Sequence, residues 1–196
     1  MNSNTLLKMV LSALFTGLMI AGALIAIPFP DVPMVIANAF PWLAGLLLGP
    51  VWAGISVGLY LLLGAFGLPV FAKGGAGIGI LLGNTGGFLV GYLLAAIVVG
   101  LLRDPEGKSV ARTALSVFAG LVAIYLVGIP WLAVVVFKGA AGFQGTHLLQ
   151  AALWGTGSKA LPGLFLIGDA IKAVAVVSAA SVLNRLPGIA SLYRKA

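Results

Sequence analysis

Long runs of apolar residues follow one another along the chain, separated by short clusters of glycine, proline and charged residues. A helix needs about 20 mainly apolar residues to cross the hydrocarbon core of a bilayer. The pattern therefore predicts six transmembrane helices, near residues 6–27, 35–49, 51–67, 83–102, 112–137 and 160–184. The second and third are short, and Gly49 and Pro50 predict a tight turn between them. We expect an all-α polytopic membrane protein in which residues 1–196 form a single membrane-embedded domain.

The composition supports this class and excludes several kinds of chemistry. Hydrophobic residues make up 61% of the chain and charged residues only 8%, whereas charged residues make up about 25% of soluble domains. The chain has no cysteine, and His147 is its single histidine. Thiol catalysis, disulfides and metal sites built from cysteines or several histidines are therefore excluded. Gly107, Lys108 and Ser109 end like a phosphate-binding loop, but Leu102 replaces the first glycine that this motif requires.

The distribution of basic residues predicts the orientation in the membrane, because cytoplasmic loops carry the excess of lysine and arginine. With six helices, both termini lie on the same side of the membrane. Seven basic residues would lie on that side: Lys8, Arg103, Lys108, Arg112, Arg185, Arg194 and Lys195. Three would lie on the other side: Lys73, Lys138 and Lys159. Both termini are therefore predicted to be cytoplasmic. The outer loops, near 28–41, 68–82 and 138–159, are candidates for a lid over an outward-facing pocket. The first apolar run, which follows Lys8, is expected to be a retained helix rather than a cleaved signal peptide.

Two charged residues, Asp169 and Lys172, lie inside the last apolar run. Residues three apart share one face of a helix, so the carboxylate and the ammonium group should point the same way. Charge inside a bilayer costs about 2.5 to 3.5 kcal/mol per residue on insertion scales, which makes such a pair a candidate functional site. The alternative is a mutually neutralising pair that only holds helices together.

Glycine is concentrated between residues 74 and 87, a segment that ends in Asn84, Thr85, Gly86 and Gly87. Asn84 would lie at the start of the fourth helix. Its amide could cap that helix, or it could offer donors and acceptors to a ligand.

Small residues also recur at four-residue spacing in the first helix, at Ala13, Gly17 and Ala21. Such a stripe allows close approach of another helix. That helix could belong to this chain or to a second membrane subunit.

Three separated motifs resemble the BioY family, the biotin-specific S components of energy-coupling factor (ECF) vitamin transporters. They are Gly-Leu-Pro-Val-Phe-Ala at 67–72 with the glycine run that follows, Leu-Leu-Gly-Asn-Thr-Gly-Gly-Phe at 81–88, and the stretch from Pro162 through Gly168-Asp169-Ala-Ile-Lys172. The resemblance extends from the turn at 46–50 to about Val182. It implies a six-helix subunit in the plasma membrane of a prokaryote that captures biotin from outside. It also implies assembly with a transmembrane coupling (T) subunit and two cytoplasmic ATP-binding-cassette ATPases.

The resemblance also implies roles for individual residues. Asn84, Asp169 and Lys172 would be polar ligands of biotin, and the stripe of Ala13, Gly17 and Ala21 would contact a partner subunit. The apolar parts of biotin would be wrapped by aromatic side chains, for which the candidates are Phe71, Phe88, Tyr92 and Trp154. The ureido group of biotin has two N–H donors and one carbonyl acceptor, which suit a carboxylate, an ammonium group and an amide.

Biotin is thus expected as a transported ligand, with no catalytic residue, metal or cofactor. Three alternatives stay open: an S component for another vitamin, an integral membrane enzyme that uses Asp169, and a purely structural membrane subunit. Competition between ligands would identify an S component for another vitamin. Turnover of a substrate that is lost in Asp169→Asn would indicate the enzyme, and a structural subunit would bind no small molecule.

Overall fold

The computed structural model describes residues 3–27, 33–104, 106–137 and 164–184. Trp154, His147 and the predicted outer loop at 138–159 lie outside these ranges. The same holds for Pro162 and for the basic residues Arg185, Arg194 and Lys195.

Helices dominate the described residues, and each of the six predicted segments overlaps with one main helix. The six main helices are α1 (Ser3–Leu24), α2 (Ala39–Leu48), α3 (Pro50–Ala65), α5 (Gly86–Leu102), α6 (Val110–Phe137) and α8 (Leu164–Leu183). Four short elements were not predicted: β1 (Ala26–Ile27), β2 (Met34–Val35), the 3-10 helix η1 (Ala72–Gly74) and α4 (Ile78–Leu82). Within the described residues, α1, α6 and α8 are long and apolar enough to cross a membrane, whereas α2, α3 and α5 are shorter apolar helices.

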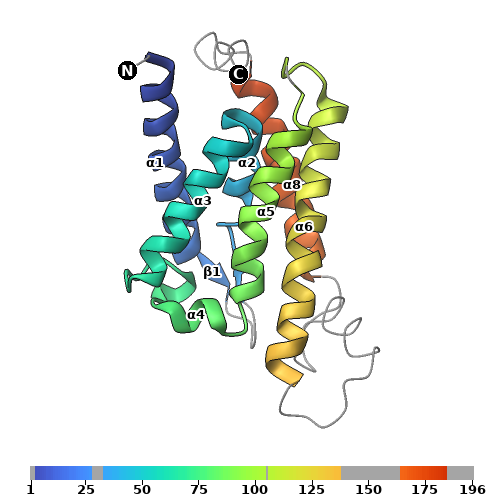
Figure 1. The fold of residues 1–196 in the computed structure, drawn as a ribbon. Coiled ribbons are helices and arrows are strands. Elements are labelled where there is room, and N and C mark those ends of the chain that lie inside the picture. Colours follow the sequence, from blue (N-terminus) through green and yellow to red (C-terminus); the bar gives the residue numbers. More distant parts are fainter. Residues whose placement is uncertain (1–2, 28–32, 105, 138–163, 185–196) are drawn as a thin grey trace.

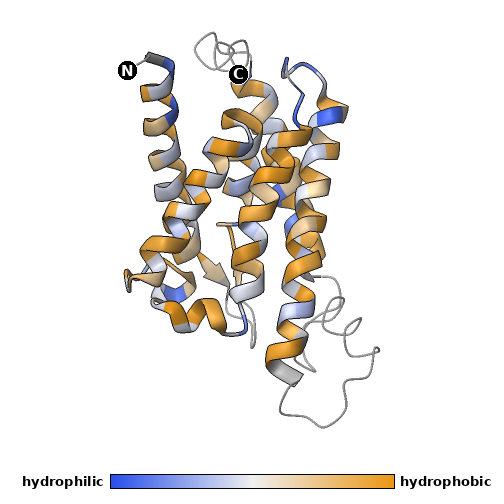
Figure 2. Ribbon diagram, in the orientation of Figure 1, coloured by the Kyte–Doolittle hydropathy of each residue, from blue (hydrophilic) through white to orange (hydrophobic). Residues whose placement is uncertain are grey.

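The helices run side by side as a bundle with two distinct ends (Figure 1). The start of α1, the turns joining α2 to α3 and α5 to α6, and the end of α8 lie at one end, which we call the N-terminal end. The antiparallel pair of β1 and β2, α4 and the start of α8 lie at the opposite end, which we call the hairpin end. Orange apolar residues cover the helices, while hydrophilic residues gather mostly near the two ends (Figure 2).

Glycines allow α5 to pack closely against its neighbours. A Cβ atom on Gly91 would lie 2.9 Å from the Cα atom of Ile124 in α6. At the contact between α5 and α2, the glycine belongs to α2: a Cβ atom on Gly45 would lie 2.7 Å from the carbonyl oxygen of Ala96 in α5. Small residues at helix contacts are the usual means of close packing in membrane proteins, where burial from water supplies little attraction between helices.

Hydroxyl groups join α1 to α3. The Thr16 hydroxyl donates to the carbonyl oxygen of Ser56 at 2.8 Å, and the Ser12 hydroxyl donates to the carbonyl oxygen of Trp52 at 3.2 Å. These three polar residues, Ser12, Thr16 and Ser56, are buried. The bonds fix the register between the two helices, because an apolar environment offers these hydroxyls no water as a partner.

The turn between α2 and α3 is held by Arg103, the residue that follows α5. Gly49 has a φ of 83°, a backbone conformation that favours glycine, and Pro50 begins α3. The guanidinium of Arg103 donates to the carbonyl oxygens of Leu46 and Leu47, at 3.4 Å and 3.2 Å. These carbonyls belong to the last turn of α2, where a cation is favourable because of the helix dipole.

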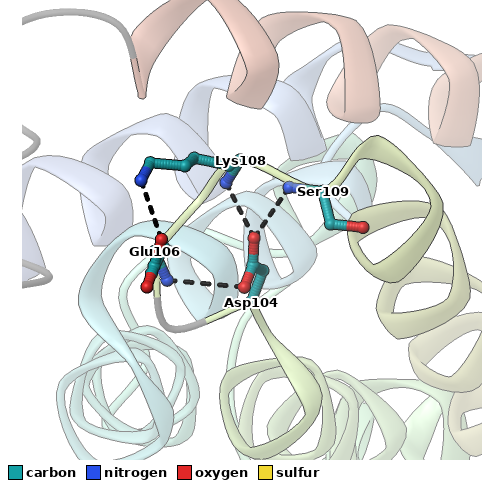
Figure 3. A network of polar contacts seen from close by, with 4 residues as sticks. All are labelled: Asp104, Glu106, Lys108 and Ser109. Atoms are coloured by element: carbon teal, nitrogen blue, oxygen red, sulfur yellow. Dashed lines mark hydrogen bonds and ion pairs between the residues drawn. The ribbon is translucent and has the colours of Figure 1, made fainter.

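A carboxylate organises the turn between α5 and α6 at the N-terminal end (Figure 3). Asp104 accepts backbone N–H bonds from Lys108 and Ser109, both at 2.7 Å, and a longer one from Glu106 at 3.4 Å. The ammonium group of Lys108 also forms an exposed ion pair with Glu106 at 2.8 Å. These bonds lower the pKa of Asp104 below its usual value, and the largest cause is the bond from the Ser109 backbone.

The stability of this turn is therefore expected to depend on pH. A carboxyl group with a lowered pKa in the folded chain stabilises the fold above its usual pKa, and this contribution is lost as the pH falls through the lower, folded-state pKa. NMR amide shifts of Lys108 and Ser109, titrated into the acid range, should change together below the usual aspartate pKa and stay constant in Asp104→Asn. A midpoint at or above the usual aspartate value would contradict the prediction.

Candidate functional site

Four polar side chains from three separate parts of the chain meet inside the bundle. Asp169 and Lys172 come from α8, Tyr125 comes from α6, and Asn38 precedes α2. One carboxylate oxygen of Asp169, Oδ1, accepts from Lys172 Nζ at 2.7 Å and from Asn38 Nδ2 at 2.8 Å. The other oxygen, Oδ2, accepts from the Tyr125 hydroxyl at 2.8 Å. Lys172 Nζ also donates to Asn38 Oδ1 at 3.0 Å. We call these four residues the polar cluster.

The charged pair of the cluster is shielded from the surface. The side chains of Asp169 and Lys172 are 7% and 14% exposed, and Asn38 is 6% exposed as a whole residue. A buried ion pair is tolerated when its remaining hydrogen-bonding positions are also satisfied. Asn38 and Tyr125 serve this purpose, because each donates to the carboxylate.

Local sequence brings α8 and the segment before α2 together. The residue before Asp169 is Gly168, and a Cβ atom there would lie 2.8 Å from the sulfur of Met34 in β2. Glycine thus lets the β1–β2 hairpin approach α8 closely. The backbone turn after Val35 is closed by a bond from the Ala39 N–H to the Ile36 carbonyl at 3.0 Å. It places Asn38 immediately ahead of α2.

Aromatic packing fixes the position of Tyr125. Its ring meets that of Phe88 edge to face, with centroids 6.3 Å apart and planes at 87°. Phe88 lies over Gly128, where a Cβ atom would overlap the Phe88 ring. The absence of a side chain at Gly128 therefore allows α5 to press Phe88 against α6 next to the cluster.

The predicted aromatic residues divide into two groups. Phe88 contacts Tyr125 directly, and Tyr92, one helical turn further along α5, is 7% exposed. Phe71 is 1% exposed and packs edge to face on Tyr60, at 5.4 Å between ring centroids. Its contacts place Phe71 in the core beside α3 rather than directly against the polar cluster.

Asn84 lies in the turn that precedes α5, and it is exposed. The residue at the N-cap position of α5 is Thr85, not Asn84. The capping role considered for Asn84 is therefore not the one the structure shows, and its role as a biotin ligand stays a prediction.

Sequence reasoning missed Asn38 and Tyr125. Both are uncharged and lie within apolar runs, so a search for charge inside predicted helices passes over them. Asn38 offered a usable signal, since an amide flanked by Ala37 and Ala39 in an apolar run needs a buried partner. Tyr125 offered less, because tyrosine is frequent at membrane interfaces and its ring suits apolar packing, so the residue alone does not indicate a buried polar site.

The stripe of small residues in α1 faces away from the bundle. Ala13, Gly17 and Ala21 are exposed, and a Cβ atom on Gly17 would have no other atom within 4 Å. The opposite face of α1 carries the buried Ser12 and Thr16 that bond to α3. Close packing against the described part of this chain therefore does not account for the stripe.

Comparison with known proteins assigns the chain to a family. The BioY family model matches residues 1–188. "Biotin transporter BioY" of Thermotoga maritima is 40% identical over 122 residues, which are 62% of this chain and 72% of that protein. "Probable biotin transporter BioY" of Pyrococcus horikoshii is 37% identical over 174 residues, which are 89% of this chain and 94% of that protein.

A solved structure shares the fold over nearly the whole length. It is the crystal structure at 2.1 Å of the S-component for biotin from an ECF-type ABC transporter, with a TM-score of 0.81 and 28% sequence identity. The match covers 99% of this chain and 100% of that one. On the evidence of its sequence and its fold, this chain belongs to the BioY family.

Proposed function

We propose that this chain is the biotin-binding S component of an ECF-type vitamin transporter. It captures biotin at the hairpin end of the bundle and delivers it inward with partner subunits, without carrying out any reaction itself. The polar cluster carries this proposal, because a buried carboxylate, an ammonium group and an amide bond one another at 2.7 to 3.0 Å. They present the donors and acceptors that a ureido group needs.

Family membership and the location of the cluster support the proposal. Asp169 lies in the second turn of α8, counted from the hairpin end, and Asn38 comes three residues after β2. Phe88 and Tyr92 line the adjoining face of α5 and supply apolar surface for the ring and chain of biotin. For the carboxylate of biotin, Lys73 is a candidate partner, since it lies exposed at the same end of the bundle.

In this proposal the chain is one membrane-embedded domain with six spans and cytoplasmic termini, in the plasma membrane of a prokaryote. The arrangement of described basic residues supports the orientation. Lys8, in the second turn of α1, belongs to the N-terminal end, as do Arg103, Lys108 and Arg112 around the turn between α5 and α6. Lys73 in η1 belongs to the hairpin end. The excess of positive charge would then face the cytoplasm.

Energy for uptake would come from partner subunits: a transmembrane coupling subunit and two ATP-binding-cassette ATPases. The outward stripe of Ala13, Gly17 and Ala21 is the proposed contact surface, because small residues let a partner helix approach to backbone distance. Open space around Gly17 supports a contact with another chain.

Gly17→Leu is therefore expected to leave biotin binding unchanged and to reduce uptake strongly, because the leucine side chain would hold the partner helix away. Biotin binding is measured on the purified chain, and uptake of labelled biotin in cells that contain the coupling subunits. Gly17→Ala is the matched control and should retain uptake, since alanine keeps the small-residue pattern. Normal uptake by the leucine variant would show that the stripe is not the contact surface.

Equilibrium binding of biotin to the purified chain in detergent tests the proposed function. Desthiobiotin, which keeps the ureido group, should compete, whereas thiamine and riboflavin should not. Displacement by another vitamin in preference to biotin would reassign the substrate. If neither biotin nor another vitamin binds, the proposal is wrong.

A further inference from the structure

We infer that Asn38 contacts the ureido group directly and helps to select a urea over a charged analogue of the same shape. The inference rests on the proposed function and deepens it. The ligand would be received by the polar cluster with the internal hydrogen bonds intact, because the cluster keeps unused donors and acceptors next to one another.

The polar cluster has two N–H donors that it does not use toward any described residue. The ammonium group of Lys172 has three N–H donors, and within the described residues two of them are used, toward Asn38 and Asp169. The amide of Asn38 has two N–H donors, and among the same described residues one of them is used, toward Asp169. One donor on each of the two side chains therefore remains for a ligand.

Two acceptor positions of the cluster also stay unused within the part of the chain that the structure describes. Asp169 Oδ1 receives two bonds, from Lys172 and Asn38, whereas Oδ2 receives one, from Tyr125. Each carboxylate oxygen can accept about two bonds, so one position on Oδ2 remains. Asn38 Oδ1 receives one bond, from Lys172, and keeps its second lone pair.

The unused donors and acceptors of the polar cluster match those of a urea group. A cyclic urea presents two N–H donors and a carbonyl oxygen with two lone pairs, and the cluster offers two acceptors and two donors. Asn38 supplies one of each. The pair of Asp169 and Lys172 is neutral as a whole, so the site suits a neutral ligand.

Selectivity follows from the donors that face the ligand's carbonyl oxygen. The probe 2-iminobiotin has a cyclic guanidine in place of the urea, so that N–H donors replace the carbonyl acceptor and the group is positively charged at neutral pH. Its extra N–H groups would face the N–H groups of Asn38 and Lys172, leaving buried donors unpaired. Sites that bond a polar group reject analogues that cannot complete those bonds.

Asn38→Asp changes this selection in a defined direction. It replaces the amide donors with a carboxylate, which gives the cluster a net negative charge. Biotin is expected to bind about 10 to 100 times more weakly, the range for leaving the buried carbonyl oxygen of the ligand without its donor. The ratio of 2-iminobiotin affinity to biotin affinity should rise by about 10-fold or more, since the cation gains an acceptor.

Isothermal titration of both ligands into the detergent-solubilised chain measures these ratios. Asn184→Asp is the matched control, because it makes the same chemical change at the end of α8, where Asn184 bonds the Gly107 carbonyl at 3.2 Å. Asn184→Asp should leave the ratio unchanged. Asn38→Leu is the second test variant; it introduces no charge, and it should weaken biotin binding without favouring 2-iminobiotin.

The outcomes separate this inference from the proposed function. If the unmodified chain does not bind biotin, the proposed function fails and the inference fails with it. If the unmodified chain binds biotin while the folded Asn38 variants keep its affinity and its ligand ratio, only the direct role of Asn38 is overturned. A weaker affinity with an unchanged ratio in Asn38→Asp would show that Asn38 positions Asp169 and Lys172 but does not select the ligand.

Discussion

Asp169→Asn is expected to lower the affinity for biotin by a factor of at least 10, and to destabilise the folded chain as well. The carboxylate accepts three hydrogen bonds, and one of them comes from the Lys172 ammonium group at 2.7 Å. A hydrogen bond to a charged group contributes about 1.5 to 3 kcal/mol. Removing one partner of a buried ion pair costs about 3 to 5 kcal/mol, because the other charge stays buried without compensation.

A double-mutant cycle separates the two effects of this substitution. Lys172→Met removes the ammonium group, so the double variant Asp169→Asn, Lys172→Met no longer buries an unpaired charge. We expect it to regain thermal stability compared with Asp169→Asn, but not biotin affinity, because the ligand's partners are missing. Biotin affinity that is unchanged in the folded Asp169→Asn chain would remove the carboxylate from the binding site.

Gly100→Val is expected to produce the largest loss of stability among single substitutions at the N-terminal end. A Cβ atom on Gly100 would lie 2.6 Å from the Cα atom of Pro50 and 2.7 Å from the carbonyl carbon of Gly49. Both are backbone atoms of the turn between α2 and α3, so no side-chain rotation can relieve the contact. Overpacking of this kind costs about 1 to 3 kcal/mol, and occasionally more.

Thermal unfolding in detergent measures this cost, with Gly58→Ala as the control. Gly58 is also a glycine within a helix, but a Cβ atom there would have no other atom within 4 Å. That variant should unfold at the same temperature or higher, since alanine favours a helix over glycine by about 1 kcal/mol. Equal stability of Gly100→Val and the unmodified chain would contradict the close approach of α5 to the turn.

Hydropathy alone located the six main helices to within a few residues, because each coincides with a long apolar run. The turn between α2 and α3 was also confirmed, since a Gly49-Pro50 pair allows little else. The length of α2 was not predicted. The apolar run at 35–49 reads as one segment, yet Val35 belongs to β2 and the helix begins only at Ala39. Apolar residues suit both a helix and a strand, so periodicity could not separate them.

The charged half of the site could be predicted, but its neutral half could not. Asp169 and Lys172 are visible because charge is rare in apolar runs, and their spacing placed them on one helix face. Their partners come from positions 131 and 44 residues away from Asp169 along the chain. Only the packing of three helices reveals that Asn38 and Tyr125 reach the same carboxylate. The outward direction of the α1 stripe also required the structure, because four-residue spacing fits an internal contact equally well.

The short length of α2 determines how deep in the bundle the polar cluster lies. Ten residues at a rise of 1.5 Å span about 15 Å, which is half of the roughly 30 Å hydrocarbon core. With its last turn anchored by Arg103, α2 places the amide of Asn38 about halfway through the bundle. One added helical turn would move that amide by about 5.4 Å, far beyond the 2.8 Å bond to Asp169. Insertions and deletions in α2 should therefore be tolerated less well than conservative apolar substitutions along it.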